Sequence, residues 1–265
     1  MDATVPGVIG IPGPLQLGIV FALGAIIGSF LNVVVWRLPR NESVVRPRSY
    51  CPACSKPIPL LWNIPLLSWL LLRGRCRNCS AWISVQYPLL ELATALLFVS
   101  LFLHQGPGLR MVAGWIVGSI LIAAAYIDGQ HKIIPNELTL PAIPVGLVLA
   151  WLAPPPGLLE AGVGALVVGG LLWGIAAAYE RVTGRVGLGL GDVKLMTMLA
   201  CFLGLEPTLG VLVLGSLLGI AQAGVVVAFR GGGRLTTIPF GPALAAAGLF
   251  HLVAPSLVAR FFQWL

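Results

Sequence analysis

Charged side chains are scarce in this sequence. Asp, Glu, Lys and Arg together make up 9% of the residues, whereas hydrophobic residues make up 58%, and the mean hydropathy is +0.96. A soluble globular domain carries roughly 25% charged residues. The composition therefore excludes an ordinary soluble domain and predicts an all-α polytopic membrane protein.

Two further features are missing. The first fourteen residues contain no Lys or Arg, so the basic n-region of a cleavable signal peptide is absent. No glycine fingerprint occurs in a βαβ context, which is the sign of a soluble dinucleotide-binding domain. The formal net charge of +7 would suit a nucleic-acid partner, but the positions of the basic residues explain this charge in another way.

Long apolar runs fill most of the chain. One helical crossing of a bilayer needs about 20 apolar residues. The runs predict about eight transmembrane helices, at residues 15–36, 87–103, 111–127, 138–152, 161–179, 193–204, 209–229 and 240–261. A further apolar stretch, 60–72, is short and interrupted by Pro65. We expect it to lie at the membrane surface or to re-enter the membrane rather than to cross it.

The basic residues orient these helices, because cytosolic loops of membrane proteins carry an excess of Lys and Arg. With eight crossings, all of the 16 Lys and Arg residues except Arg110 and Arg260 fall on one side. That side includes the long polar stretch 37–86, which we therefore expect to be cytosolic. The basic charge then serves topology and attracts anionic lipid head groups, and no nucleic-acid partner is expected.

Four of the five cysteines form two CxxC pairs within this polar stretch, Cys51 with Cys54 and Cys76 with Cys79. Cytosolic thiols stay reduced, which favours metal binding over disulfides. Four thiolates are the usual ligand set of a tetrahedral structural zinc site. The spacing predicts one structural zinc ion, with thiol redox chemistry as the alternative. Cys201, alone in an apolar run, is expected to be buried and to bind no metal.

Two aspartates lie at the edges of apolar runs on the cytosolic side. Asp128 ends the third run, and Asp192 opens the sixth within the glycine-rich stretch GLGLGDVK. Two adjacent carboxylates cannot both ionise cheaply, so one keeps a proton while the other stays charged. Such a pair can activate water for attack on a peptide carbonyl and donate a proton to the developing oxyanion. We therefore predict a catalytic dyad.

Less specific explanations exist for both aspartates. Asp128 lies four residues before Lys132, Asp192 lies near Arg185 and Lys194, and an aspartate can also simply cap a helix. A proton-coupled transporter also uses membrane carboxylates, although these usually sit near the bilayer midplane.

The motifs, taken in order, resemble those of one family. The chain is similar to the bacterial type IV prepilin peptidases, bifunctional leader peptidases and N-methyltransferases that also serve type II secretion systems. The resemblance extends from about Gly28 to Pro242. The matching segments are GSFLNVVVWRLP, the paired CxxC motifs, NIPLLSWLLLRGRCRNC, QYPLLELATAL, IDGQHKIIPNELTLP, GLGLGDVKLM and IPFGPALA.

This resemblance implies that Asp128 and Asp192 are the catalytic pair of a GxGD-type intramembrane aspartyl protease. The substrates would be type IV prepilins or pseudopilins, cleaved after a short basic leader at the cytosolic face of the bacterial inner membrane. Residues 1–105 would support methyl transfer from S-adenosylmethionine, and residues 106–265 would form the peptidase region. The sequence departs from the family pattern at Gln130 and Asn136, where acidic residues are common.

Methyl transfer has the weaker basis in the residues themselves. The second run offers Glu91, which is either a helix-packing residue or a participant in methylation, and no residue is assigned to the cofactor. The competing hypothesis for the whole chain is a zinc-stapled membrane scaffold without enzymatic activity, or a small transporter.

Overall fold

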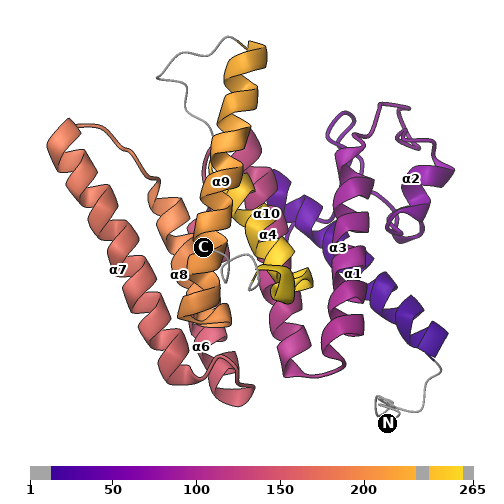
Figure 1. The fold of residues 1–265 in the computed structure, drawn as a ribbon. Coiled ribbons are helices and arrows are strands. Elements are labelled where there is room, and N and C mark those ends of the chain that lie inside the picture. The colour runs from indigo at the N-terminus through magenta and orange to yellow at the C-terminus, as the bar shows by residue number, and fades with distance from the viewer. Residues whose placement is uncertain (1–12, 231–238, 259–265) are drawn as a thin grey trace. The chain divides into compact units, whose positions relative to one another are not determined.

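A computed structural model describes residues 13–230 and 239–258, and the chain divides into two units, Met1–Pro107 and Gly108–Leu265. The described residues form helices and no strands, apart from two isolated β-bridges (Figure 1). The expected all-α architecture is confirmed. Each unit is described by itself below.

The first unit consists of two long helices and the loop that joins them. Its helices are α1 (Gly13–Arg37), the 3-10 turns η2 (Leu38–Arg40) and η3 (Leu60–Trp62), the short α2 (Leu67–Leu71) and α3 (Gln86–Gln105). The long helices α1 and α3 pack against each other. The loop between them holds the four paired cysteines.

Glycines allow α1 and α3 to approach closely. A Cβ atom on Gly24 would lie 2.7 Å from Ala95 Cα, and one on Gly28 would lie 2.6 Å from Glu91 Cα. No real side chain fits at such distances. In lipid, helices associate through this kind of close contact between small residues, because the bilayer supplies no hydrophobic driving force between them.

The second unit is a bundle of seven named helices within the described residues: α4 (Leu109–His131), α5 (Asn136–Thr139), α6 (Ala142–Leu152), α7 (Leu158–Thr183), α8 (Leu190–Leu203), α9 (Leu205–Arg230) and α10 (Gly241–Val253). Helix α8 contacts α4, α5, α6, α7 and α9, and α10 contacts α4 and α9 (Figure 1). Most side chains of α8 are buried, among them Leu195, Met196 and Leu199 with no exposed surface. Its largely buried apolar surface suits a place in the middle of the bundle.

Five helices of the described chain are long and apolar enough to cross a membrane. They are Gly13–Arg40, Gln86–Gln105, Leu109–His131, Leu158–Thr183 and Leu205–Phe229, and they correspond to the first, second, third, fifth and seventh predicted runs. The protein is therefore a multi-pass membrane protein. The other three predicted runs form shorter helices, so the total of eight crossings stays a prediction.

Prolines explain two of these shorter helices. Run 138–152 is divided into α5 and α6 at Pro141, which has no N–H to donate to the preceding turn. Run 240–261 is interrupted after Val253, because Ala254 precedes Pro255 and takes a non-helical conformation. Residues 259–261 of that run lie outside the described residues. Run 193–204 corresponds to α8, which begins three residues earlier, at Leu190.

The apolar stretch 60–72 forms only η3 and the five-residue α2. Several of its leucines are exposed, including Leu61 at 79% and Leu71 at 72%. The segment is far shorter than the roughly 20 residues that one crossing needs.

Candidate active site and metal centre

The four paired cysteines lie together in the loop of the first unit. The Sγ atoms of Cys51, Cys54, Cys76 and Cys79 are all within 4.8 Å of one another, and Cys51 Sγ is 3.8 Å from Cys79 Sγ. Four Zn–S bonds of about 2.3 Å in a tetrahedron place the sulfur atoms ~3.8 Å apart. All five cysteines of the chain are free thiols. The cluster thus has the composition and the spacing of a four-thiolate metal site.

Each CxxC pair is held by the same local backbone turn. In the first turn, Cys51 N donates to Lys56 O at 3.0 Å and Ser55 N donates to Cys51 O at 2.8 Å. In the second, Cys76 N donates to Ala81 O at 2.8 Å and Ser80 N donates to Cys76 O at 2.9 Å. Both serines have positive φ, 55° and 58°. The sequence therefore builds two equivalent knuckles, and each presents two thiols on one side.

The backbone of the second knuckle also favours a thiolate. N–H groups of Cys79 and Asn78 point at the Cys76 sulfur and lower the pKa of that thiol to about 7. The Asn78 N–H lies 3.4 Å from the sulfur atom. A metal ion binds the deprotonated thiolate, so these N–H groups favour Cys76 as a ligand, whereas desolvation and the neighbouring thiols raise the pKa of Cys79 in the same knuckle to about 11.

Asp128 lies in the last turns of α4, where its carboxylate meets the beginning of α10. The backbone N–H of Gly241 donates to Asp128 Oδ2 at 2.9 Å, and Gly241 is the first residue of α10. The first N–H groups of a helix have no partner within the helix, and the helix dipole attracts negative charge there. Asp128, which is 6% exposed, satisfies this helix end.

Asp192 lies in the first turn of α8, but it is not the helix cap. Gly189 is the N-cap residue, and this end of α8 has no side-chain cap hydrogen bond. A Cβ on Gly189 would lie 3.1 Å from Asp192 Oδ2, so the glycine leaves room for the carboxylate. The capping explanation for Asp192 does not fit this geometry.

The two aspartates belong to the same unit and interact. Helices α4 and α8 pack against each other, and the charge of Asp128 acts on the Asp192 carboxyl group. The two carboxylates thus act on each other electrostatically, and their joint role as a catalytic dyad stays a prediction.

The nearby lysines differ in what they do. Lys194 donates from Nζ to Asn136 Oδ1 at 2.8 Å, so it connects α8 to the beginning of α5 instead of pairing with Asp192. The charge of Lys132 does act on Asp128, as the local explanation for that residue expected.

Two contributors were missed by sequence reasoning. Gly241 belongs to the quoted segment IPFGPALA, but its backbone role toward a residue 113 positions away leaves no periodic or charge signal. Asn136 was noted as a departure from the family pattern, and its bond to Lys194 was not expected. Cys201 is fully buried as predicted, and its S–H donates to Thr197 O.

Comparisons with known proteins match both units. A family model described as "Bacterial Peptidase A24 N-terminal domain" matches residues 22–105, and one described as "Type IV leader peptidase family" matches residues 115–224. The chain is 38% identical over 272 residues to the prepilin leader peptidase/N-methyltransferase of Aeromonas hydrophila, with 94% of each chain covered. It is 33% identical over 275 residues to the protein of that name from Neisseria gonorrhoeae, with 95% of each chain covered.

A third relative carries a different name. The "Type 4 prepilin-like proteins leader peptide-processing enzyme" of Escherichia coli O78:H11 is 38% identical over 257 residues, which cover 88% of this chain and 92% of that one. No solved structure matches the chain. Because the identity to these relatives extends over nearly the whole length of both proteins, this chain belongs to the type IV leader peptidase family.

Proposed function

We propose that this protein is a membrane aspartyl endopeptidase that removes the short basic leader of type IV prepilins or type II secretion pseudopilins. It then methylates the new N-terminal residue with S-adenosylmethionine. The supporting observation is the family membership, which extends through both units. This membership favours a processing enzyme over a zinc-stapled scaffold or a small transporter.

In this proposal, Asp128 and Asp192 carry the cleavage. Two interacting carboxylates share one proton, because ionising both at once is costly. The N–H of Gly241 favours the charged form of Asp128, so Asp128 takes the proton of the attacking water. Asp192 accepts no hydrogen bond from the described residues and donates its proton to the oxyanion that forms at the scissile carbonyl. The reaction requires no covalent intermediate.

The cysteine cluster is proposed to hold one zinc ion through Cys51, Cys54, Cys76 and Cys79. Four protein thiolates fill the tetrahedral coordination shell and leave no open position for substrate. The ion would therefore cross-link the two knuckles and stabilise the loop between α1 and α3, and it would take no part in peptide hydrolysis. The pairwise sulfur distance of 3.8 Å supports this assignment.

The two activities are proposed to divide between the units. Residues 1–105 would hold the zinc loop and serve methylation, and residues 106–265 would hold the peptidase dyad. We place the zinc loop and both aspartates at the cytosolic face of the bacterial inner membrane. The excess of basic residues on that side supports the placement.

The test is an assay of the purified protein in detergent, with a full-length prepilin and S-adenosylmethionine. We expect a product that lacks the leader and carries an N-methyl group, as read by intact-mass spectrometry. Uncleaved substrate at high enzyme concentration, with prepilin inserted in the same micelles, would overturn the proposed peptidase activity.

A further inference from the structure

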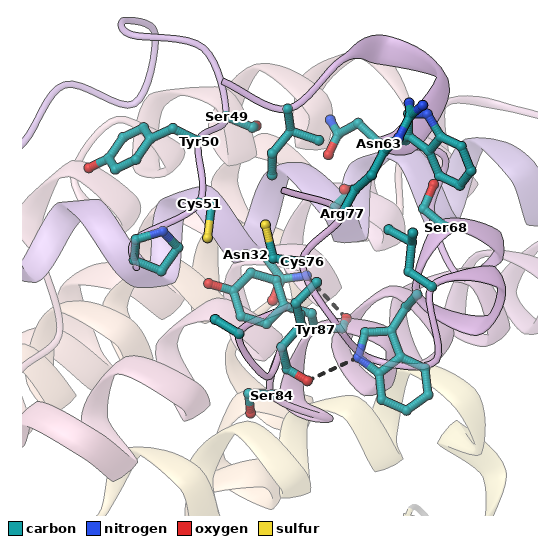
Figure 2. Close-up of a pocket in the computed structure, with 18 of the residues that line it drawn as sticks. Asn32, Ser49, Tyr50, Cys51, Asn63, Ser68, Cys76, Arg77, Ser84 and Tyr87 are labelled. Atoms are coloured by element: carbon teal, nitrogen blue, oxygen red, sulfur yellow. Dashed lines mark hydrogen bonds between the residues drawn. The ribbon is translucent and has the colours of Figure 1, made fainter. Parts of the chain in front are cut away.

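A cavity of about 350 Å³ lies within the first unit, between α1, α3 and the loop that joins them. Figure 2 shows residues of all three segments around this space, among them Asn32 of α1, Tyr87 of α3 and Arg77 of the loop. Its volume lies in the range of small-molecule sites, roughly 300–1,000 Å³. All of its lining residues fall between Ser29 and Glu91, so the peptidase dyad has no part in it.

The cavity wall contains one buried carboxylate. Glu91 is 7% exposed, and its Oε2 accepts a hydrogen bond from Leu66 N at 2.7 Å. The Ser29 hydroxyl donates a second one. No ion pair from a described Lys or Arg side chain compensates this carboxylate. A buried carboxylate without a cation suits a cationic ligand, because removing a charge from water is costly unless it is paired.

Aromatic rings and one guanidinium supply complementary contacts. Trp36, Trp62, Trp69 and Tyr87 all line the cavity. Trp69 is fixed by a hydrogen bond from Nε1 to Ile83 O at 3.1 Å. The guanidinium of Arg77 lies 4.6 Å from the centre of the Trp62 ring. Such rings suit a flat heterocycle, and Arg77 suits a carboxylate.

The wall is held in place at two points. Asn32 Nδ2 donates to Tyr87 O at 3.1 Å, which ties α1 to the start of α3 (Figure 2). Two of the four clustered cysteines, Cys51 and Cys76, also line the cavity. A metal bound by the cluster would therefore fix the loop side of the cavity.

We propose that this cavity is the S-adenosylmethionine site, with Glu91 facing the sulfonium, Arg77 facing the methionine carboxylate and tryptophan rings stacking on the adenine. This assignment rests on the proposed methyltransferase activity and locates it. Cation–aromatic attraction adds to the recognition of the sulfonium. In the reaction, an N–C bond forms at the new N-terminal amine while the C–S bond breaks. Its electron pair stays on sulfur, giving S-adenosylhomocysteine, and the amine releases one proton to water.

The test is calorimetric titration of the zinc-loaded, full-length protein in detergent with S-adenosylmethionine and with S-adenosylhomocysteine. The variant Glu91→Gln keeps the shape and an acceptor for Leu66 N but loses the charge. The sulfonium carries a full positive charge but no N–H or O–H donor, so the variant removes a charge attraction, and affinity for S-adenosylmethionine should fall roughly ten- to hundred-fold. Affinity for S-adenosylhomocysteine should change far less, because its sulfur is neutral.

Three further variants separate binding from folding. Trp62→Ala should weaken both ligands about five- to hundred-fold, since one base–aromatic stack is worth roughly 1–3 kcal/mol. Glu42→Gln and Trp151→Ala are the matched controls, because both residues are exposed and neither lines the cavity. All four variants should retain zinc and leader cleavage.

The outcomes distinguish location from function. If the wild type methylates and binds S-adenosylmethionine, but Glu91→Gln and Trp62→Ala bind it as tightly, the cavity is the wrong site and the proposed function stands. If the wild type cleaves prepilin but neither binds the ligand nor methylates, the methyltransferase proposal fails and this inference fails with it. The inference would also be overturned if added lipid abolished the S-adenosylmethionine binding signal while S-adenosylhomocysteine left it unchanged.

Discussion

The backbone N–H of Gly241 donates a hydrogen bond to Asp128 Oδ2 at 2.9 Å, across 113 residues of chain. This bond joins the end of α4 to the beginning of α10. It orients the carboxylate and supplies a partial positive charge beside it. In the proposed mechanism it holds the base of the dyad in position.

The first prediction concerns the dyad. Asp128→Asn and Asp192→Asn should each abolish leader cleavage, while expression and membrane insertion remain normal. Asparagine is nearly isosteric but cannot exchange the proton that the mechanism moves. Each acid–base contribution is worth typically 10²–10⁴-fold in rate. When residues act as one catalytic unit, removing either of them costs nearly the whole rate enhancement of the unit. Cleavage rates on a purified prepilin measure this.

The control for these variants is Glu137→Gln, an exposed acid-to-amide change on α5. Substantial cleavage by either asparagine variant would end the dyad hypothesis.

The second prediction concerns Gly241. A Cβ at this position would lie 2.8 Å from Asp128 Oδ2 and 3.0 Å from Asp128 Cβ, so Gly241→Ala should displace the carboxylate. We expect the cleavage rate to fall by about 10²-fold or more, the low end of an acid–base contribution. Gly170→Ala on α7 is the matched control, because a Cβ there meets nothing within 4 Å. Equal rates for the two alanine variants would show that the contact with Asp128 has no role in cleavage.

The third prediction concerns the metal. Elemental analysis of the purified protein should find one zinc ion per chain. Cys76→Ser should lose it and loosen the loop 41–85, because metal binding is coupled to folding of such loops. Limited proteolysis within the loop reports this change. Cys201→Ser changes a cysteine outside the cluster and should keep the zinc. Native reduced protein without any bound metal would refute the assignment.

The fourth prediction separates the two proposed activities. Glu91→Gln should cleave prepilin at the wild-type rate, because Glu91 lies outside the second unit, and at limiting S-adenosylmethionine it should methylate the new N-terminus far more slowly than the wild type. Asp128→Asn should do the reverse: it should leave prepilin intact but methylate a pilin that already lacks its leader. Mass spectrometry of the N-terminal peptide measures both. Normal methylation by Glu91→Gln, or a loss of cleavage, would contradict the assigned role.

The knuckles were predictable because their bonds are local. Cys51 N and Lys56 O are five residues apart, as are Cys76 N and Ala81 O, so CxxC spacing alone indicates the turn. The two aspartates were also singled out from the sequence, because an ionisable residue at the edge of an apolar run is costly and therefore rare, and their catalytic role stays a prediction. Both the knuckles and the aspartates were recognised from the chemistry of single positions and their near neighbours. The sequence by itself determined these local features.

Other features required the tertiary structure. Gly241 reaches Asp128, and Lys194 reaches Asn136, only because helices distant in sequence pack side by side. The cavity around Glu91 exists because Gly24 and Gly28 bring α1 against α3 while the loop folds over both. Hydropathy and spacing describe each helix separately, whereas these contacts depend on which faces meet, and only the packed structure decides that.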